Sequence, residues 1–127
     1  AIKNGINVIP IPGASALIAA LTVAGFPTNS FLFEGFLPQK KGRQKLLSEL
    51  SKEKRTIILY ESSHRIEKLL NELNEYMPNR MLAVCRELTK KFEEVIRGYP
   101  EEILTNLTSN QKKGEFVVVI SPLNWKE

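Results

Sequence analysis

Residues 55–61 read RTIILYE, a continuous apolar run of strand length that lies between a basic and an acidic residue. Its β-branched and aromatic residues favour a strand, and the absence of apolar/polar alternation indicates that both faces of this strand are buried. A strand buried on both faces needs cover above and below it. Residues 55–61 therefore predict the central strand of an α/β domain.

The segments on either side of this strand alternate between strand and helix. A strand at 31–36 and a helix from about Gly42 precede it. After it comes a helix that Ser62 and Ser63 can cap and that stops at Pro78. A second strand of the buried type, RMLAVCREL, then covers residues 80–88. The order strand, helix, strand, helix, strand predicts parallel pairing through crossover connections.

The remaining segments add two strands and a helix. A short connection at 88–93 predicts a hairpin into a strand that ends at Gly98, a helix begins at Pro100, and EFVVVIS at 115–121 is the last strand. About five strands and about four helices result. The sequence thus predicts an α/β three-layer sandwich with a mixed sheet, because the hairpin is antiparallel.

The beginning of the chain is uncharged from Asn4 to Phe33, although 25% of all residues are charged. A short β segment and a Pro-Gly turn lead into the helix ASALIAALTVAG at 14–25, which is apolar nearly all round and therefore predicted to be buried. Its continuous apolar part is shorter than the ~20 residues that a bilayer requires. Residues 13–16 are small, so their free N–H groups can bind a ligand or the turn can simply pack closely.

The length of 127 residues is that of one domain. The opening AIKNGI has no initiator Met and resembles the last turn of a helix that stops at Gly5. We expect residues 1–12 to be the tail of a preceding domain with its linker, and residues 13–127 to be a C-terminal α/β domain of a longer protein.

Charge and cysteine content restrict the class of protein. The net charge of +4 and the pI near 9.3 are compatible with a polyanionic partner without requiring one. Cys85 is the only cysteine, which excludes an intramolecular disulfide and favours a cytoplasmic location. With one histidine and one cysteine, no transition-metal site is expected.

Three polar segments are candidates for chemistry. LPQKKGRQK at 37–45 is a basic run that can contact phosphates or be an ordinary solvated surface. YESSHR at 60–65 follows a predicted strand at the end where open α/β sheets bind ligands, but no nucleophile-elbow glycines flank its serines. CRELTKKFEEVIRG at 85–98 concentrates charges that can pair across a hairpin or act on a substrate.

The order of these motifs resembles the tetrapyrrole methylase superfamily. PGASALIAAL, GFLPQKKGR, YESSHR and RELTK follow one another as they do in its bacterial small-subunit ribosomal RNA methyltransferase I branch, over essentially the whole chain. That family methylates a cytidine ribose 2′-oxygen with S-adenosylmethionine. The resemblance implies two α/β domains with the methyl donor between them and a homodimer. This chain resembles the second domain, so by itself it is not expected to catalyse.

The resemblance also implies roles for individual residues. The expected contacts of S-adenosylmethionine are Ser15, Ala16, Glu61, Leu88 and Val118. The expected contacts of ribosomal RNA in the small subunit are Lys40, Lys41, Arg43, His64 and Arg65. The clustering of charges in RELTKKFEE, and not the resemblance, suggests three candidates for orienting the ribose hydroxyl or accepting its proton, namely Glu87, Lys90 and Glu94. Ser63 stands where the family often has proline.

Two other interpretations stay open at the level of sequence. The same fold and donor can serve a tetrapyrrole methyltransferase of the precorrin type. A basic α/β module that binds RNA or protein without any cofactor is compatible with the composition as well.

Overall fold

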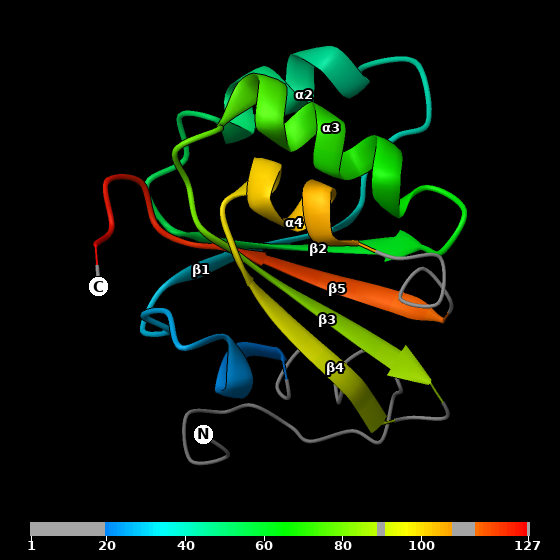
Figure 1. Ribbon diagram of the computed structural model, residues 1–127. Coiled ribbons are helices and arrows are strands. Elements are labelled where there is room, and N and C mark those ends of the chain that lie inside the picture. Colours follow the sequence, from blue (N-terminus) through cyan, green and yellow to red (C-terminus); the bar gives the residue numbers. More distant parts are fainter. Residues whose placement is uncertain (1–19, 89–90, 108–113, 127) are drawn as a thin grey trace, which may run out of the picture.

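The computed structural model describes residues 20–88, 91–107 and 114–126 of the chain. Its strands form one five-stranded sheet in the order β1-β2-β5-β3-β4 (Figure 1). In chain order the elements are β1 (Phe31–Phe36), α2 (Arg43–Leu50), β2 (Thr56–Ser62), α3 (Ile66–Tyr76), β3 (Leu82–Leu88), β4 (Lys91–Gly98), α4 (Pro100–Asn106) and β5 (Glu115–Ile120).

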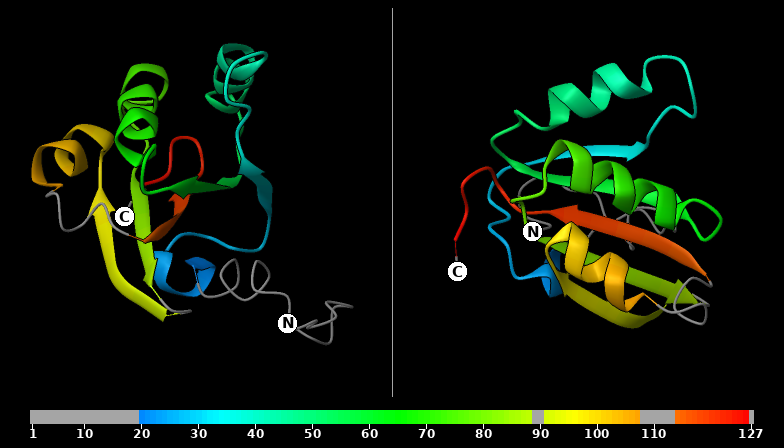
Figure 2. Two further views of the ribbon diagram at one scale, coloured as in Figure 1. Left: turned by 90° about the vertical axis from the view of Figure 1, so that its right-hand side faces the viewer. Right: turned by 45° about the horizontal axis from the view of Figure 1, so that its top comes forward.

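The sheet lies between two helical layers, as the left view of Figure 2 shows. Helices α2, α3 and α4 cover one face and enclose the larger apolar core. Helical residues 20–24, with Phe26 and Trp125, cover part of the other face. The predicted α/β architecture with a mixed five-stranded sheet is thereby confirmed. No helix within the described residues is long and apolar enough to cross a membrane.

Strand β2 is an interior strand that is covered on both faces, as its apolar run predicts, although the middle of the sheet is occupied by β5. Ile57 and Leu59 pack into the core under the helices, and Ile58 packs into the core on the opposite face. All three side chains are fully buried. The alternation of neighbouring side chains between two faces explains why no polar position interrupts the run.

The predicted pairing of β2 with β3 is wrong. β1 and β2 pair in parallel, but β5 lies between β2 and β3 and is antiparallel to both. Strand β5 is buried from Phe116 to Ile120, so it is covered on both faces and gains most from a central place. The alternation of elements therefore predicted the direction of β3 correctly but not its neighbour.

The edge strand β1 contains a β-bulge at Glu34 and Gly35. The extra residue shifts the register, so that Phe33 pairs with Ile58 and Phe36 pairs with Tyr60, on the same face of the sheet. Both phenyl rings contact the Tyr60 ring edge to face, at centroid distances of 5.3 and 5.6 Å. Phe36 remains 61% exposed.

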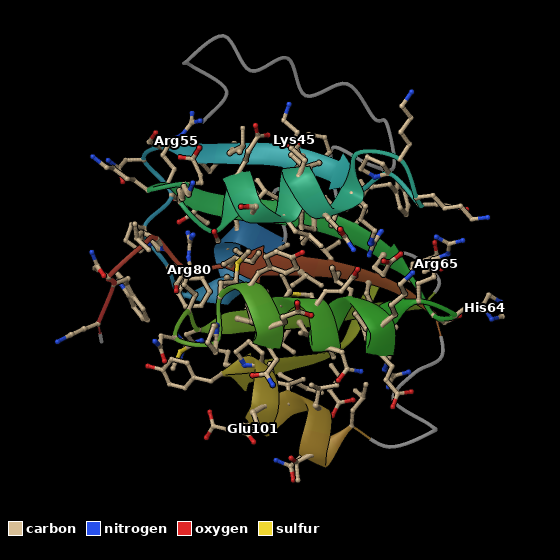
Figure 3. The ribbon with its side chains drawn as sticks, turned by 90° about the horizontal axis from the view of Figure 1, so that it is seen from above. Lys45, Arg55, His64, Arg65, Arg80 and Glu101 are labelled. Carbon is tan, nitrogen blue, oxygen red and sulfur yellow. The ribbon has the colours of Figure 1, made fainter. Side chains whose placement is uncertain are left out.

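Arg80 holds together the end of the sheet at which β2 and β3 begin and β5 ends. Its buried guanidinium donates to the carbonyl oxygens of Leu50, Arg55 and Ser121 at 2.7–3.1 Å. These carbonyls belong to the end of α2, the approach to β2 and the residue after β5. Arg80 and Arg55 both lie at this end of the molecule in Figure 3. No role for Arg80 was predicted from the sequence.

Candidate functional site

The polar residues that the sequence singles out gather at one end of the strands, which is called the carboxyl edge of the sheet below. The carboxyl ends of β1, β2 and β3 and the beginning of β5 meet there, on the right of Figure 1. The turn after β1 carries the lysines of the basic run, and the turn after β2 carries His64 and Arg65. Ligands of open α/β sheets bind at this kind of edge.

An ion pair between the buried Arg43 and the partly buried Glu72 organises these strand ends. Arg43, the first residue of α2, donates from Nε to both carboxylate oxygens of Glu72 on α3, at 3.1 and 2.9 Å, and from Nη2 to Oε1 at 2.6 Å. Its Nη1 donates to the carbonyl oxygen of Pro38 at 2.8 Å. The pKa of Arg43 is raised, above all because of the hydrogen bonds to Glu72 and in spite of burial. The pair fastens the turn after β1 to α3.

Arg43 therefore does not face solvent as the predicted phosphate contact would. Its side chain is only 5% exposed, and the N–H groups of its guanidinium are directed at Glu72 and Pro38. Burial of a cation is stable only with such partners, so Arg43 acts as a brace for the turn. Within the described residues, the exposed side chains of Lys40 and Lys41 have no ion pair.

Glu61 lies at the end of β2, as predicted, but its carboxylate is turned inward. One carboxylate oxygen is 3.9 Å from Nη2 of Arg43, and the other accepts the backbone N–H of Ser62 at 3.0 Å. Glu61 pairs in register with Phe116, which packs into the core under the helices. The side chain is 7% exposed, so a ligand from solvent meets the backbone of this strand end more readily than the carboxylate.

The turn between β2 and α3 differs from the predicted serine cap. Helix α3 begins at Ile66 with Arg65 as its N-cap residue and without a side-chain cap, because Ser62 still belongs to β2. The backbone N–H of Arg65 donates to the carbonyl oxygen of Ser62 at 3.0 Å. His64 projects into solvent at the outer end of this turn, next to Arg65 (Figure 3).

One pair of hairpin charges meets across the strands, in line with the local interpretation of CRELTKKFEE. Arg86 and Glu94 are opposite each other in register, with Nη2 and Oε1 at 3.5 Å. Among the residues that the structure describes, no hydrogen-bond acceptor lies within reach of the buried Nε of Arg86. Glu87 and Leu88 end β3, with Glu87 opposite Glu115 of β5. Lys90, Ser15 and Ala16 lie outside the described residues.

Val118 is part of the core and not of a binding surface. Its side chain is fully buried in the cluster under the helices. Its strand pairs with Leu59 on one side and Val84 on the other, so its backbone is enclosed as well. The predicted donor contact near Val118 is therefore not supported at this residue.

Glu72 is the main residue of the site that the sequence did not reveal. It stands on α3 one turn after Lys68, among polar and charged residues that are typical of an ordinary solvated helix face. Nothing local indicates that it meets Arg43, which is 29 residues earlier. Among the described residues there is no group of three or more His, Cys, Asp or Glu side chains that can hold a metal ion.

Three comparisons relate this chain to known proteins. Residues 1–104 match the family of Tetrapyrrole (Corrin/Porphyrin) Methylases. The chain is 48% identical over 121 residues to ribosomal RNA small subunit methyltransferase I of Halalkalibacterium halodurans and 50% identical over 121 residues to that of Synechocystis sp.. Each alignment covers 94% of this chain but 42% and 43% of the two relatives, so the chain spans less than half of their length.

The fold is shared with a solved methyltransferase. The crystal structure of the methyltransferase CobJ superposes with a TM-score of 0.60 at 19% identity. The superposition covers 87% of this chain and 49% of that protein. At this identity the likeness concerns the arrangement of helices and strands.

Proposed function

The chain belongs to the tetrapyrrole methylase family, and we propose that it is the C-terminal domain of an S-adenosylmethionine-dependent methyltransferase of small-subunit ribosomal RNA. The observation that carries this proposal is the identity of 48–50% to relatives of that name across nearly the whole chain. The alignment includes the edge where the basic turn, Glu61 and the hairpin meet.

We further propose that the accepting atom is the 2′-oxygen of a cytidine ribose. Methyl transfer is an in-line displacement: the bond from the ribose oxygen to the methyl carbon forms while the carbon–sulfur bond of the donor breaks. The hydroxyl proton passes to a base on the protein. Glu87 and Glu94 at the hairpin, and Lys90 in the same segment, are the proposed groups that orient the hydroxyl or accept its proton.

The residues of the edge fit the donor chemically. S-adenosylmethionine supplies an electrophilic methyl group when bound. Its carboxylate is a hydrogen-bond acceptor, which the buried Nε of Arg86 lacks among the described residues. The backbone at Glu61 and Leu88, where β2 and β3 end, remains a proposed contact, together with the turn at Ser15 and Ala16.

Phosphate contacts are proposed for four residues at the same ends of the strands: Lys40, Lys41, His64 and Arg65. Lys40 and Lys41 project from a turn that Arg43 holds, and His64 and Arg65 project from the next turn. Cations on braced turns bind phosphates without reading base sequence, which suits positioning of a structured RNA. A homodimer and a cytoplasmic location remain predictions from the family resemblance and from the single cysteine.

The test uses the intact protein, purified small ribosomal subunits and S-adenosylmethionine with a labelled methyl group. We expect label in the ribosomal RNA at a cytidine whose 3′ phosphodiester resists alkaline hydrolysis, because a methylated 2′-oxygen cannot attack it. Label in a precorrin-type ring and not in RNA would support the tetrapyrrole alternative. RNA binding without any methyl transfer would support the non-catalytic module.

The proposed base is tested in the same assay. Glu87→Gln, Lys90→Met and Glu94→Gln are compared at saturating donor and RNA. A group that accepts the proton contributes 10²–10⁴-fold to the rate in typical enzymes, so its replacement is expected to lower kcat by about that factor. Unchanged rates for all three variants would move the base to another part of the protein.

A further inference from the structure

A hollow opens between the turn after β1 and the beginning of α3. Its volume is about 550 Å³. It is lined by Lys40, Gln44, Lys45 and Lys68 and by the ion pair of Arg43 and Glu72. The turn, α2 and α3 thus each contribute to its wall.

The hollow is strongly cationic. Glu72 is the only carboxylate among its lining residues, and both of its oxygens already accept hydrogen bonds from Arg43. The lysine side chains have no ion pair within residues 20–88, 91–107 and 114–126. Their charges are therefore not neutralised by the protein and are available to an anion.

The walls of the hollow are held in place. Arg43 fastens the turn to α3 through Glu72 and Pro38, and its backbone N–H donates to the carbonyl oxygen of Lys40 at 3.1 Å. Lys68 stands one helical turn before Glu72, so the same ion pair fixes Lys68 relative to Lys40. Lys45 also lines the hollow, but Figure 3 shows it on the side of α2 that faces away from α3, so it is not one of the direct contacts proposed below.

We propose that this hollow binds a phosphate of the RNA backbone, with Lys40 from the turn and Lys68 from α3 as its direct contacts. The inference rests on the proposed RNA substrate and extends its binding surface from the turns onto α3. Arg65, the N-cap residue of α3, precedes Lys68 by three positions. A row of positive charges then leads an RNA strand to the carboxyl ends of the strands. We call this row the cationic track, and it consists of the lysines of the turn, Lys68 and Arg65. Arg43 is a positioning residue for this track.

The proposal is tested by the salt dependence of RNA binding. Lys40→Ala, Lys68→Ala and the double variant are made in the intact protein, and affinity for small-subunit ribosomal RNA is measured by filter binding between 50 and 200 mM salt. Each lysine that contacts a phosphate contributes about 0.7–0.9 to the slope of log affinity against log salt. We expect each single variant to flatten the slope by about that amount and the double variant by about twice as much.

Lys52→Ala is the matched control. Lys52 is an exposed lysine directly after the C-terminal end of α2 and does not line the hollow. Its replacement is expected to leave the slope unchanged. In the methylation assay the two contact variants are expected to raise KM for RNA while kcat at saturating RNA and the Kd of the methyl donor stay the same.

Two results would overturn the inference, and they differ from failure of the proposed function. A slope that is unchanged in Lys68→Ala, in a wild-type protein that does methylate ribosomal RNA, would mean that the hollow does not hold RNA. An equal change of slope in Lys52→Ala would mean a diffuse charge effect and no site. If the wild-type protein modifies no RNA, the proposed function fails first.

Discussion

At the scale of the residue, the pair of Arg43 and Glu72 decides how the basic run is used. The run has four cations within six positions, and nothing in the sequence distinguishes a buried cation from an exposed one among them. The structure buries one of them and leaves the lysines exposed. The buried cation has four hydrogen bonds to Glu72 and Pro38 and defines the shape of the turn that presents the others.

Replacing Glu72 by glutamine is expected to destabilise the intact protein. The buried guanidinium of Arg43 would keep only the more distant Glu61 carboxylate, at 3.9 Å, as a counter-charge, and losing hydrogen bonds to a charged group costs about 1.5–3 kcal/mol. The measurement is the free energy of unfolding in urea. The control is Glu75→Gln, because Glu75 is exposed on the same helix and its replacement is expected within about 0.5 kcal/mol of wild type. Equal values for both variants would show that the ion pair does not stabilise the fold.

Cys85 is predicted to be chemically inert in the native state. It is fully buried under residues 20–26, and burial raises the pKa of its thiol to about 12. The nucleophilic thiolate is therefore scarce at pH 8. We expect no alkylation of the peptide that contains Cys85 in native protein and complete alkylation in urea, measured by mass spectrometry. Rapid alkylation of the folded protein would contradict the burial.

The same residue is expected to make stability fall in alkaline solution. Its thiol ionises near pH 9 in the unfolded chain but only near 12 in the folded one. The protonated form favours folding, so its contribution is complete below pH 9 and is lost as the pH rises toward 12, by at most about 1.4 kcal/mol per pH unit. The unfolding free energies of wild type and Cys85→Ala, compared from pH 8 to 11, isolate this contribution. Parallel pH curves for the two proteins would contradict it.

At the scale of the element, the two ends of the strands differ in structure and in proposed role. The carboxyl edge presents turns and exposed cations. The opposite end is closed by Arg80, which joins the end of α2, the approach to β2 and the residue after β5. Three segments are held together by the N–H groups of the single Arg80 guanidinium, so we predict that this end of the sheet is rigid. The proposed binding groups lie at the carboxyl ends of β1, β2 and β3.

Arg80→Lys is expected to destabilise the intact protein by about 2–4 kcal/mol, since an ammonium group cannot reach three separated carbonyls and each buried acceptor left unpaired costs about 1–3 kcal/mol. The urea midpoint measures this. Arg55→Lys is the control, because the Arg55 side chain is largely exposed and bonds only to the nearby Glu53. An Arg80→Lys midpoint as high as that of Arg55→Lys would refute the role of the Arg80 guanidinium.

At the scale of the whole molecule, the chain has the fold of its family but spans only about half the length of the curated relatives that it matches. We predict that the 127-residue chain alone binds S-adenosylmethionine at least about tenfold more weakly than the intact protein, because contacts from the remainder of the pocket are missing. Isothermal titration of both proteins measures this, with circular dichroism to verify that the chain is folded. Equal dissociation constants would place the entire donor site within these residues.

The sequence by itself determined the elements of this protein. The apolar run at 55–61, the stripe of α3 and the proline at the start of α4 specify strand or helix by local periodicity and backbone chemistry, and the structure agrees. The order of motifs also indicated the family, which the comparisons establish. These features are local in the chain or depend only on order, so they can be predicted without coordinates.

Only the tertiary structure decided which elements and side chains meet. The insertion of β5 between β2 and β3 depends on how much apolar surface each strand buries against both layers, and no local pattern encodes that choice. The same holds for Arg43, whose partner Glu72 is 29 residues away, and for Arg80, whose acceptors are 25–41 residues away. A charged side chain in a sequence is predicted to be exposed by default, and only the packed structure shows which charges are buried as braces and which remain free to bind.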